Sequence, residues 1–368
     1  MSFIETISRP TLLLDETVAR RNLERMAAKA SQRGVRFRPH FKTHMSQAVG
    51  RWCRDAGVRQ ITVSSPGMAM YFARDGWDDI TVAFPVNRRQ IQEINALAET
   101  IHLGLLVEDV ETVEWLDKHL VAPADLWIKI DTGGGRTGIP YDQPELVVSV
   151  ARTILRGSHV HFAGILTHAG HTYRVNGREQ ILATFHESNA RMLAVKEVLI
   201  QAGMQGFEVS IGDTPGCTLT DQFDGADEIR PGNFIFYDAH QWSIGSCPAE
   251  DIAVALACPV VAKHPERNEV VVYGGAIHLS KDVIHVNGKP SYGLPAAWQG
   301  DRWGAPLVGG MVRMLSQEHG VVQLSPADFD RVQLGDLLPI IPAHSCLTVQ
   351  VCGEYWTLDG LRITVHNR

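Results

Sequence analysis

The chain has 368 residues, of which 45% are hydrophobic, and its 34 basic and 41 acidic residues give a net charge of −7. This length and apolar content suffice for a large buried core and favour one large domain with a smaller one. There is no long run of one charge sign and no apolar run near the roughly 20 residues of a membrane span. We therefore expect neither nucleic acid nor a membrane as a partner.

The first ten residues lack the basic start and the apolar run of a signal peptide, so we expect a cytoplasmic protein. The six cysteines are scattered without a CxxC pair or the spacing of a disulfide framework. We expect them to be reduced thiols, at least one of which can serve as a metal ligand.

The N-terminal region begins with an apolar run, Thr11–Asp15, that is typical of a strand. Apolar residues then recur at helical spacing from Val18 to Ala30, and Gly34 suits the end of that helix. The segment that follows, residues 36–44, carries an unusual concentration of basic and imidazole side chains.

Lys42 lies in this segment where a short extended stretch ends, between His40 and His44. Arg36 and Arg38 are also close in the chain, so the amine has several cationic or potentially cationic neighbours, which favour its neutral form. A neutral lysine amine can form an imine with a carbonyl group of a cofactor or substrate. Taken alone, the same residues also fit a basic, solvated loop.

Six short runs rich in apolar and β-branched residues follow and have the character of buried strands. They are Ile61–Ser65, Ile80–Phe84, His102–Val107, Leu126–Ile130, Phe162–Leu166 and Phe207–Ile211, with amphipathic helical segments between them. Together with Arg36–Pro39 and Glu228–Arg230 they make about eight βα units. The sequence therefore predicts an α/β fold with a TIM-like (β/α)8 barrel. A doubly wound sheet of about six or seven strands is the alternative.

After residue 245 the helical periodicity fades, and strand-like runs alternate with Gly, Pro and Asn turns. The runs are Ile252–Val261, Glu269–Tyr273, Val283–Val286, Gly320–Leu324 and Thr348–Val351. We therefore expect the barrel over residues 15–245 and a smaller antiparallel β domain made of residues 1–14 and 246–368.

Chemistry in such a barrel lies at the carboxyl ends of the strands, where the following loops converge. Loops with unusual residues at these positions are 131–138 with Arg136, 167–173 with His168, His171 and Tyr173, 212–216 with Thr214, and 230–233 with Asn233. Gly212 and Gly232 would let backbone N–H groups approach a phosphate, and loops after the last two strands are the usual phosphate site of such barrels. Each loop taken alone also fits an ordinary turn.

A second cluster, Pro342–Thr348, lies in the expected β domain and contains His344 and Cys346. On an extended segment, residues two apart face the same side, so both side chains can bind one ion. An imidazole and a thiolate suit Zn²⁺ best, and two protein ligands leave positions open for water or substrate. A core histidine beside a core cysteine is the alternative.

Taken together, these segments resemble the fold-type III pyridoxal-phosphate enzymes, and within them the D-serine dehydratase/D-threonine aldolase family. The resemblance is specific at Arg38–His44, Asp131–Gly138, His168–Tyr173 and His344–Thr348, and it covers nearly the whole chain in order. It implies an alanine racemase-like barrel, pyridoxal 5'-phosphate as cofactor, and a divalent metal, Zn²⁺ with Mn²⁺ or Mg²⁺ as alternatives. It also implies a homodimer with the active site at the subunit interface.

By this resemblance, Lys42 would bind the cofactor covalently and act as the catalytic base. The other cofactor-binding residues would be His40, Arg136 at the phenolic oxygen, Tyr173 near the pyridine nitrogen, His171 close to the ring, and Gly212, Thr214, Gly232 and Asn233 at the phosphate. His344 and Cys346 would hold the metal, and a His-x-Cys pair in place of His-x-Asp favours the dehydratase branch. Met45 departs from the pattern of many relatives, which carry lysine there.

The expected reaction is the dehydration of D-serine or a related 3-hydroxy-D-amino acid to a 2-oxo acid and ammonia. Retro-aldol cleavage of D-threonine-like substrates to glycine and an aldehyde is the first alternative, because an activated hydroxyl can lose its proton instead of leaving. An amino-acid racemase and a non-catalytic pyridoxal-phosphate-binding protein are further alternatives. The His344 and Cys346 pair argues against both of these, since neither uses a metal.

Overall fold

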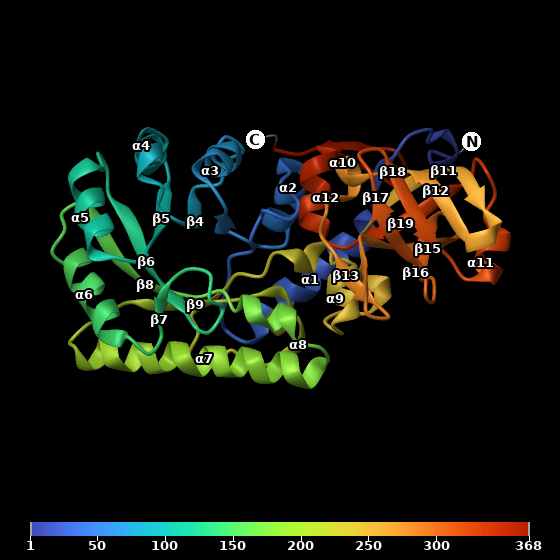
Figure 1. Cartoon of the computed structure of the whole chain (residues 1–368). Helices are drawn as coiled ribbons and strands as arrows, with labels where there is room; N and C mark the ends of the chain where they lie inside the picture. Colours follow the sequence, from blue (N-terminus) through green and yellow to red (C-terminus); the bar gives the residue numbers. More distant parts are fainter. Residues whose placement is uncertain (1, 367–368) are drawn as a thin grey trace. The chain divides into compact units, whose positions relative to one another are not determined.

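The computed structural model describes residues 2–366 and divides into two compact units, each with its own sheet (Figure 1). Of the described residues, the first unit contains 2–24, 43–49 and 233–366. The second unit contains residues 25–42 and 50–232. The units thus interleave along the chain, whereas the sequence suggested one boundary near residue 245.

Among the described residues, parallel strands form the barrel of the second unit in the order β2-β10-β9-β8-β6-β5-β4-β3. Their bounds are β2 Arg36–Phe37, β3 Ile61–Val63, β4 Asp79–Pro85, β5 His102–Val107, β6 Ala124–Asp131, β8 Val160–Leu166, β9 Glu208–Ile211 and β10 Glu228–Ile229. A short strand β7 (Ile139–Pro140) pairs with the end of β6. A parallel bridge between His40 and Thr62 joins the two ends of the order and closes the ring. The predicted barrel is confirmed.

Helices connect these strands and lie outside them (Figure 1). They are α1 Glu16–Gln32, α2 Gln47–Asp55, α3 Pro66–Ala73, α4 Ile91–Ala98, α5 Val110–His119, α6 Pro144–Ile154, α7 Arg178–Gln201 and α8 Thr214–Leu219, with 3-10 turns at Arg88–Gln90 and Gly170–Arg174. Side-chain caps begin several of them: Ser65 accepts from the Met68 N–H at 3.2 Å, and Asp109 accepts from the Thr112 N–H at 2.7 Å. No helix in the described part of the chain is long and apolar enough to cross a membrane.

The inside of the barrel departs from the aliphatic filling that is usual in such barrels. An apolar layer of Leu106, Trp127 and Leu166 fills its middle. At the mouth formed by the amino ends of the strands, a cavity of about 340 Å³ is lined largely by charged and polar side chains, among them Arg36, Asp79 and Glu208. The barrel therefore buries charge at one end.

The sheet of the first unit is mostly antiparallel and has the order β16-β15-β19-β11-β1-β20-β21. These strands are β1 Thr11–Leu14, β11 Val254–His264, β15 Gly293–Gln299, β16 Arg302–Pro306, β19 Leu337–Pro342, β20 Glu354–Thr357 and β21 Arg362–Thr364. Strands β12 Glu269–Tyr273, β18 His319–Gln323 and β17 Met311–Leu315 extend it from β11, and β13 Ile284–Val286 pairs with β14 Lys289–Ser291. Because β1 pairs with β11 and β20, the N-terminal strand belongs to this sheet.

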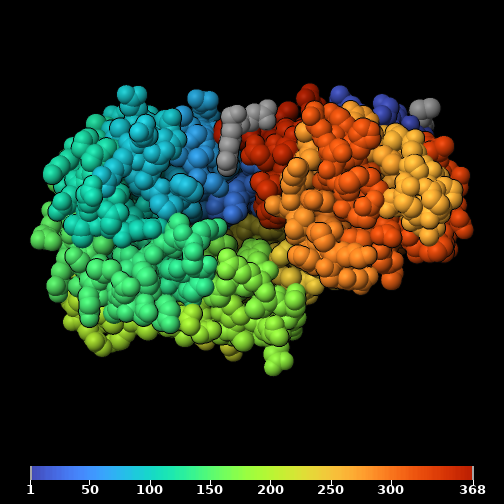
Figure 2. Space-filling view, in the orientation of Figure 1, coloured from blue at the N-terminus to red at the C-terminus, as the bar shows by residue number. Residues whose placement is uncertain are grey.

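Short helices also occur in this unit, and all of them except α9 lie where the sequence predicted only strands. They are α9 Ala239–Ser243, α10 Ala276–Leu279, α11 Pro326–Arg331 and α12 Ser345–Cys352, with 3-10 turns at Ile4–Thr6, Asn233–Ile235, Ala249–Asp251 and Pro265–Arg267. The expected strand Thr348–Val351 was wrong, because these residues lie inside α12. A short apolar, β-branched run does not by itself distinguish a strand from a buried helix. On the face drawn in Figure 2, closely packed side chains cover the surface of each unit.

Candidate active site

Lys42 follows β2 in a turn whose position is fixed by a buried neighbour. Phe41 is fully buried and packs against Phe72 and Trp77, with ring centroids 4.9 and 5.2 Å away. The Lys42 N–H donates to Nδ1 of His40 at 3.3 Å. The backbone of Lys42 is therefore held at the carboxyl end of β2, where the chemistry of such barrels lies.

Two histidines near Lys42 are held in the neutral form. Burial lowers the pKa of His40 well below its ordinary value, and the charges of Lys42 and Arg230 lower it further. Burial and the charge of Lys42 do the same to the pKa of His168, whose Nδ1 lies 2.9 Å from the Gly212 carbonyl oxygen. Since Nδ1 of His168 donates to that carbonyl and Nδ1 of His40 accepts from an N–H, both imidazoles have a defined tautomer.

Arg136 lies in a glycine-rich loop that Asp131 organises. The Asp131 carboxylate accepts backbone N–H groups from Gly133, Gly134 and Gly135 at 2.9, 2.8 and 3.0 Å. Burial opposes ionisation of Asp131, but these three donors outweigh it and lower its pKa. The charge of Arg136 contributes to the lowered pKa values of His40 and His168. Arg136 therefore lies close enough to His40 and His168 for its charge to act on both.

Lys129 is a second amine in this region that the sequence analysis missed. It is 5% exposed at the carboxyl end of β6, and its Nζ donates to the Ile130 carbonyl oxygen at 2.9 Å. Burial, together with the charges of Arg230 and Arg136, lowers the pKa of Lys129 to about 7. A charged residue inside the apolar run of β6 was the available sequence signal, since such a lysine must be buried or face the barrel interior.

The loop after β9 forms a cradle with free hydrogen-bonding capacity. Gly212 has φ +138°, and a Cβ at this position would lie 2.6 Å from the Arg230 backbone nitrogen, so only glycine fits. The Thr214 Oγ1 is buried and has no hydrogen-bond partner among residues 2–366, while the Thr214 N–H donates to the Tyr173 hydroxyl at 3.1 Å. The Pro231 carbonyl accepts from the His40 N–H at 2.9 Å. This hydrogen bond holds the loop that contains Gly232 beside His40.

Asp213 joins this cradle to the loop after β8. Its Oδ1 accepts from the Gly216 N–H at 2.6 Å and from the Thr172 hydroxyl at 2.8 Å. Burial raises the pKa of Asp213 to about 7. The sequence analysis assigned Asp213 no role, and its one signal was a position typical of a helix N-cap.

His171 lies against the glycine-rich loop. Cβ atoms added to Gly133 and Gly134 would lie 3.9 Å from its Nε2 and Nδ1, respectively. Neither ring nitrogen has a hydrogen-bond partner in the described part of the chain, and burial together with Arg191 lowers the pKa of His171. These unpartnered buried atoms and the Thr214 hydroxyl fit a polar cofactor that carries a phosphate.

The His344 and Cys346 pair belongs to the first unit. His344 is the extended residue before α12, and Cys346 lies in the first turn of that helix, so the expected extended geometry for both was wrong. The two side chains nevertheless converge: burial opposes protonation of His344, but Cys346 and Asp238 raise its pKa well above the ordinary value. The Cys346 Sγ also lies 3.2 Å from the Thr43 hydroxyl, and Thr43 is the residue that follows Lys42 in the chain.

Asp238, which the sequence analysis missed, supports this pair from behind. Its Oδ2 accepts from His344 Nδ1 at 3.1 Å, from the Ser345 N–H at 3.0 Å and from Asn233 Nδ2 at 2.7 Å. The Asn233 amide also contacts Ser345 Oγ and Cys346 Sγ, so the structure places this side chain in the His344 cluster. A carboxylate behind a histidine is the usual outer partner of a metal ligand.

The donor set fits a metal bound by two protein ligands. With Nδ1 of His344 held by Asp238, Nε2 is the nitrogen available to an ion. Among residues 2–366 there is no cluster of three or more His, Cys, Asp or Glu side chains that could hold a metal. The Asn233 Oδ1 is buried and lacks a partner among these residues. A structural zinc site needs four protein ligands, so these two residues fit only a site that leaves positions open for water or substrate.

A parallel barrel with a lysine after its first strand and a glycine-bearing loop after β9 is the arrangement of one class of protein, the alanine racemase-like pyridoxal-phosphate fold. The family model of the alanine racemase N-terminal domain matches residues 14–240, and that of a putative serine dehydratase domain matches residues 253–358. The chain belongs to the fold-type III family of pyridoxal-phosphate lyases that combines these two domains.

Individual relatives are similar over almost the whole chain. The D-threo-3-hydroxyaspartate dehydratase of Delftia sp. (strain HT23) is 30% identical over 352 residues, which cover 93% of this chain and 92% of the relative. Its solved structure matches with a TM-score of 0.91 at 28% identity and covers 100% of both chains. The D-serine dehydratase of Dictyostelium discoideum is 29% identical over 97% of this chain and 95% of the relative. The D-threonine aldolase of Arthrobacter sp. is 24% identical over 92% of this chain and 86% of the relative.

Proposed function

We propose that the protein is a lyase that uses pyridoxal 5'-phosphate and a divalent metal to remove water from 3-hydroxy-D-amino acids. D-Serine or a related substrate would yield a 2-oxo acid and ammonia. The observation that carries this proposal is the His344 and Cys346 pair backed by Asp238, because it supplies a metal site that a racemase does not need. Two relatives named as dehydratases of D-amino acids support it.

Lys42 is proposed to hold the cofactor and to take the α-proton of the substrate. When bound, pyridoxal 5'-phosphate supplies an electron sink for the charge left at the α-carbon. The neutral state of His40 and His168 matters here, because two further positive charges beside Lys42 would lower its basicity. Thr214, Gly212 and Gly232 are proposed to hold the phosphate, and Arg136, His171 and Tyr173 to contact the ring.

His344 and Cys346 are proposed to hold the metal ion, with Zn²⁺ favoured and Mn²⁺ or Mg²⁺ as alternatives. The ion supplies Lewis-acid chemistry that makes a hydroxyl a better leaving group. Asp238 orients the His344 ring, and the Thr43 hydroxyl lies within hydrogen-bonding distance of the Cys346 sulfur. The solved structures similar to this chain include a cysteine-to-alanine mutant of a D-threo-3-hydroxyaspartate dehydratase in the metal-free form, which supports the proposal that a cysteine binds the metal.

Retro-aldol cleavage to glycine and an aldehyde is the second candidate function. It is favoured by the similarity to the D-threonine aldolase of Arthrobacter sp.. The two outcomes differ in whether the activated hydroxyl leaves or loses its proton, and one donor set serves both. We further propose a cytoplasmic homodimer that acts on small-molecule D-amino acids.

The test is to incubate the purified protein with D-serine, D-threonine and 3-hydroxy-D-aspartate, with and without a chelator, and to identify the products. A 2-oxo acid and ammonia that disappear with the chelator would support the dehydratase. Glycine and an aldehyde would establish the aldolase instead. Racemised substrate with activity unaffected by the chelator would contradict both functions.

A further inference from the structure

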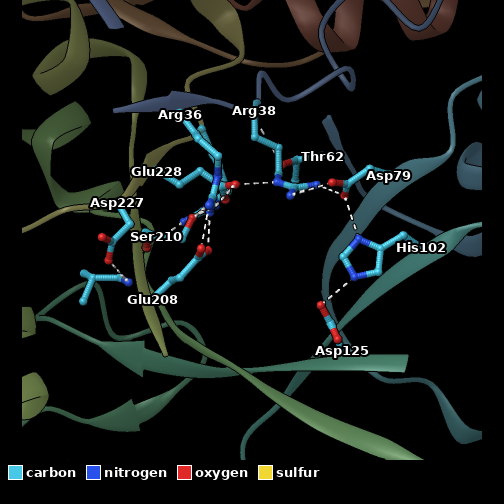
Figure 3. A network of polar contacts seen from close by, with 12 residues as sticks. Arg36, Arg38, Thr62, Asp79, His102, Asp125, Glu208, Ser210, Asp227 and Glu228 are labelled. Atoms are coloured by element: carbon cyan, nitrogen blue, oxygen red, sulfur yellow. Dashed lines mark hydrogen bonds and ion pairs between the residues drawn. The ribbon is translucent and has the colours of Figure 1, made fainter. Parts of the chain in front are cut away.

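A chain of polar contacts runs through the inside of the barrel from the mouth at the amino ends of its strands (Figure 3). Arg38 binds two carboxylates, Glu228 through Nε at 2.6 Å and Asp79 through Nη1 at 2.5 Å. His102 continues the chain between Asp79, at 3.6 Å, and Asp125, at 2.7 Å. The Arg38 and Glu228 side chains are buried and the His102 side chain is 60% exposed, so these contacts connect the interior of the second unit with its mouth.

The network reaches the carboxyl ends of the strands through one hydroxyl. Ser210 Oγ donates to Glu228 Oε1 at 2.7 Å and accepts from Arg230 Nε at 2.7 Å. Ser210 and Glu228 are fully buried, and Arg230 is 4% exposed. Because the hydroxyl hydrogen is directed to the carboxylate, the Ser210 lone pair is directed to the arginine. Glu228 is thus linked to Arg230 without touching it.

Among the described residues, Arg230 donates hydrogen bonds through two of its three nitrogens. Besides the Nε bond, Nη2 donates to the carbonyl oxygens of Thr167 and Ser210. Nη1 has no hydrogen-bond partner among the described residues. The Arg230 charge contributes to the lowered pKa values of His40 and Lys129, so the guanidinium is close enough to both to act on them. Within residues 2–366 one N–H₂ group of Arg230 is therefore left without an acceptor, close to His40 and Lys129.

We propose that Ser210 and Glu228 are positioning residues that hold Arg230 in place and balance its charge for a cofactor bound at Lys42. Burying the charged Arg230 without a direct carboxylate partner is costly in free energy. Ser210 offsets part of this cost, because its hydroxyl connects Arg230 to the Glu228 carboxylate. This inference rests on the proposed function, because it assigns Arg230 to the site where the cofactor would be held.

If the network had a purely structural role, removing any one of its charges would have a similar effect on the barrel and on cofactor binding. The proposed role is specific to the branch that ends at Arg230. The Arg36 and Glu208 pair provides the comparison, because it lies at the same mouth and loses the same charge in a Glu→Gln change. Arg36 also lies 3.5 Å from Glu228, but among the described residues neither Arg36 nor Glu208 has a hydrogen bond to Ser210 or Arg230.

The experiment uses the cofactor-loaded protein and its Ser210→Ala, Glu228→Gln and Glu208→Gln variants. The readouts are the affinity for pyridoxal 5'-phosphate and the pH titration of the visible absorbance of the lysine-bound cofactor. We expect Ser210→Ala to weaken cofactor binding about threefold to tenfold, the usual effect of one lost hydrogen bond. Glu228→Gln removes a negative charge, disfavours the protonated cofactor linkage, and is expected to move the titration midpoint to lower pH. Glu208→Gln should change neither readout.

The outcomes separate the inference from the proposed function. If the native protein binds the cofactor at a lysine but Ser210→Ala and Glu228→Gln match Glu208→Gln in both readouts, the positioning role is overturned. If the native protein shows no lysine-bound cofactor, the proposed function fails and the inference fails with it. Should Glu228→Gln not fold, Ser210→Ala decides alone, because it removes a hydroxyl and leaves every charge in place.

Discussion

The Nδ1 of His344 donates to the buried carboxylate of Asp238 at 3.1 Å, and the same carboxylate oxygen accepts three further donors around it. The other oxygen, Oδ1, accepts the Gln241 N–H at 2.9 Å. Both oxygens are thus acceptors in fixed positions, and this arrangement sets the orientation of the His344 ring.

The first prediction concerns this carboxylate. In Asp238→Asn the amide N–H₂ must face either the His344 side or the Gln241 N–H, and in both cases a donor meets a donor. We expect about 10- to 100-fold weaker metal binding, the usual loss for an outer partner of a metal-binding histidine. Competition with a zinc chelator measures it. Asp251→Asn is the control, because Asp251 is equally buried in the same unit but pairs with Arg21. Equal metal affinity in the two variants would contradict the role of Asp238.

The second prediction concerns the choice between two amines. The charges of Arg230 and Arg136 act on Lys129 and on His40, which also feels the charge of Lys42, and burial lowers the pKa of Lys129 to about 7. Borohydride reduction of the cofactor-loaded protein followed by peptide mass spectrometry should place the added mass at Lys42. Lys42→Ala should carry no label and should lose about 100- to 10,000-fold in rate, the usual contribution of a positioned base. Label at Lys129 would refute the assignment.

The third prediction compares two glycines with positive φ in neighbouring parts of the chain. Alanine at Gly212 adds backbone strain and also a Cβ that lies 2.6 Å from the Arg230 nitrogen, whereas alanine at Gly206, with φ +70°, meets nothing within 4 Å. We expect Gly206→Ala to cost about 1 kcal/mol and Gly212→Ala about 3 kcal/mol or more in free energy of unfolding. Urea unfolding measures the difference. Cofactor affinity should fall only in Gly212→Ala, because Gly212 also holds His168; a parallel fall in Gly206→Ala would count against the cradle.

The fourth prediction concerns the pH dependence of stability. The folded protein holds the Asp213 proton up to a pKa of about 7, whereas the unfolded chain releases it near 3.8. Between these values the folded state binds more protons, so the free energy of unfolding that Asp213 contributes falls as the pH rises.

Asparagine at position 213 resembles the protonated acid and removes this dependence. Relative to the native protein, Asp213→Asn should gain stability between pH 4 and pH 8, by up to about 4 kcal/mol. Urea unfolding of both cofactor-free proteins at several pH values tests this, since the other titrating groups are common to both and cancel in the difference. A difference that does not change with pH would show that Asp213 is ionised in the folded state.

Much of the fold could be predicted from the sequence, because the barrel strands are buried on both faces and appear as continuous apolar runs. The bounds of β5, His102–Val107, and of β12, Glu269–Tyr273, were predicted to the residue. Helix α12 was not, because a short apolar run between Pro342 and Gly353 fits either element until its tertiary surroundings are known.

The candidate site divides in the same way. Lys42, His344 and Cys346 stand in local patterns with recognisable chemistry, so the sequence pointed to them. Asp238 and Arg230 acquire their roles only through partners far away in the chain, at His344 and at Ser210. Local sequence gives no signal for a contact that the closed ring or the second sheet creates.

The charged interior of the barrel also bears on how the chain folds. Arg38 and Glu228 are separated by 190 residues of sequence and occupy β2's end and β10, neighbours in the closed ring. During synthesis Arg38 emerges long before Glu228, so this ion pair cannot form until the last barrel strand is made. Loop closure over such a separation is slow. We therefore expect the barrel to close, and the Arg38 and Glu228 pair to lose its water, in one late folding step. Until then the strands made earlier form an open sheet.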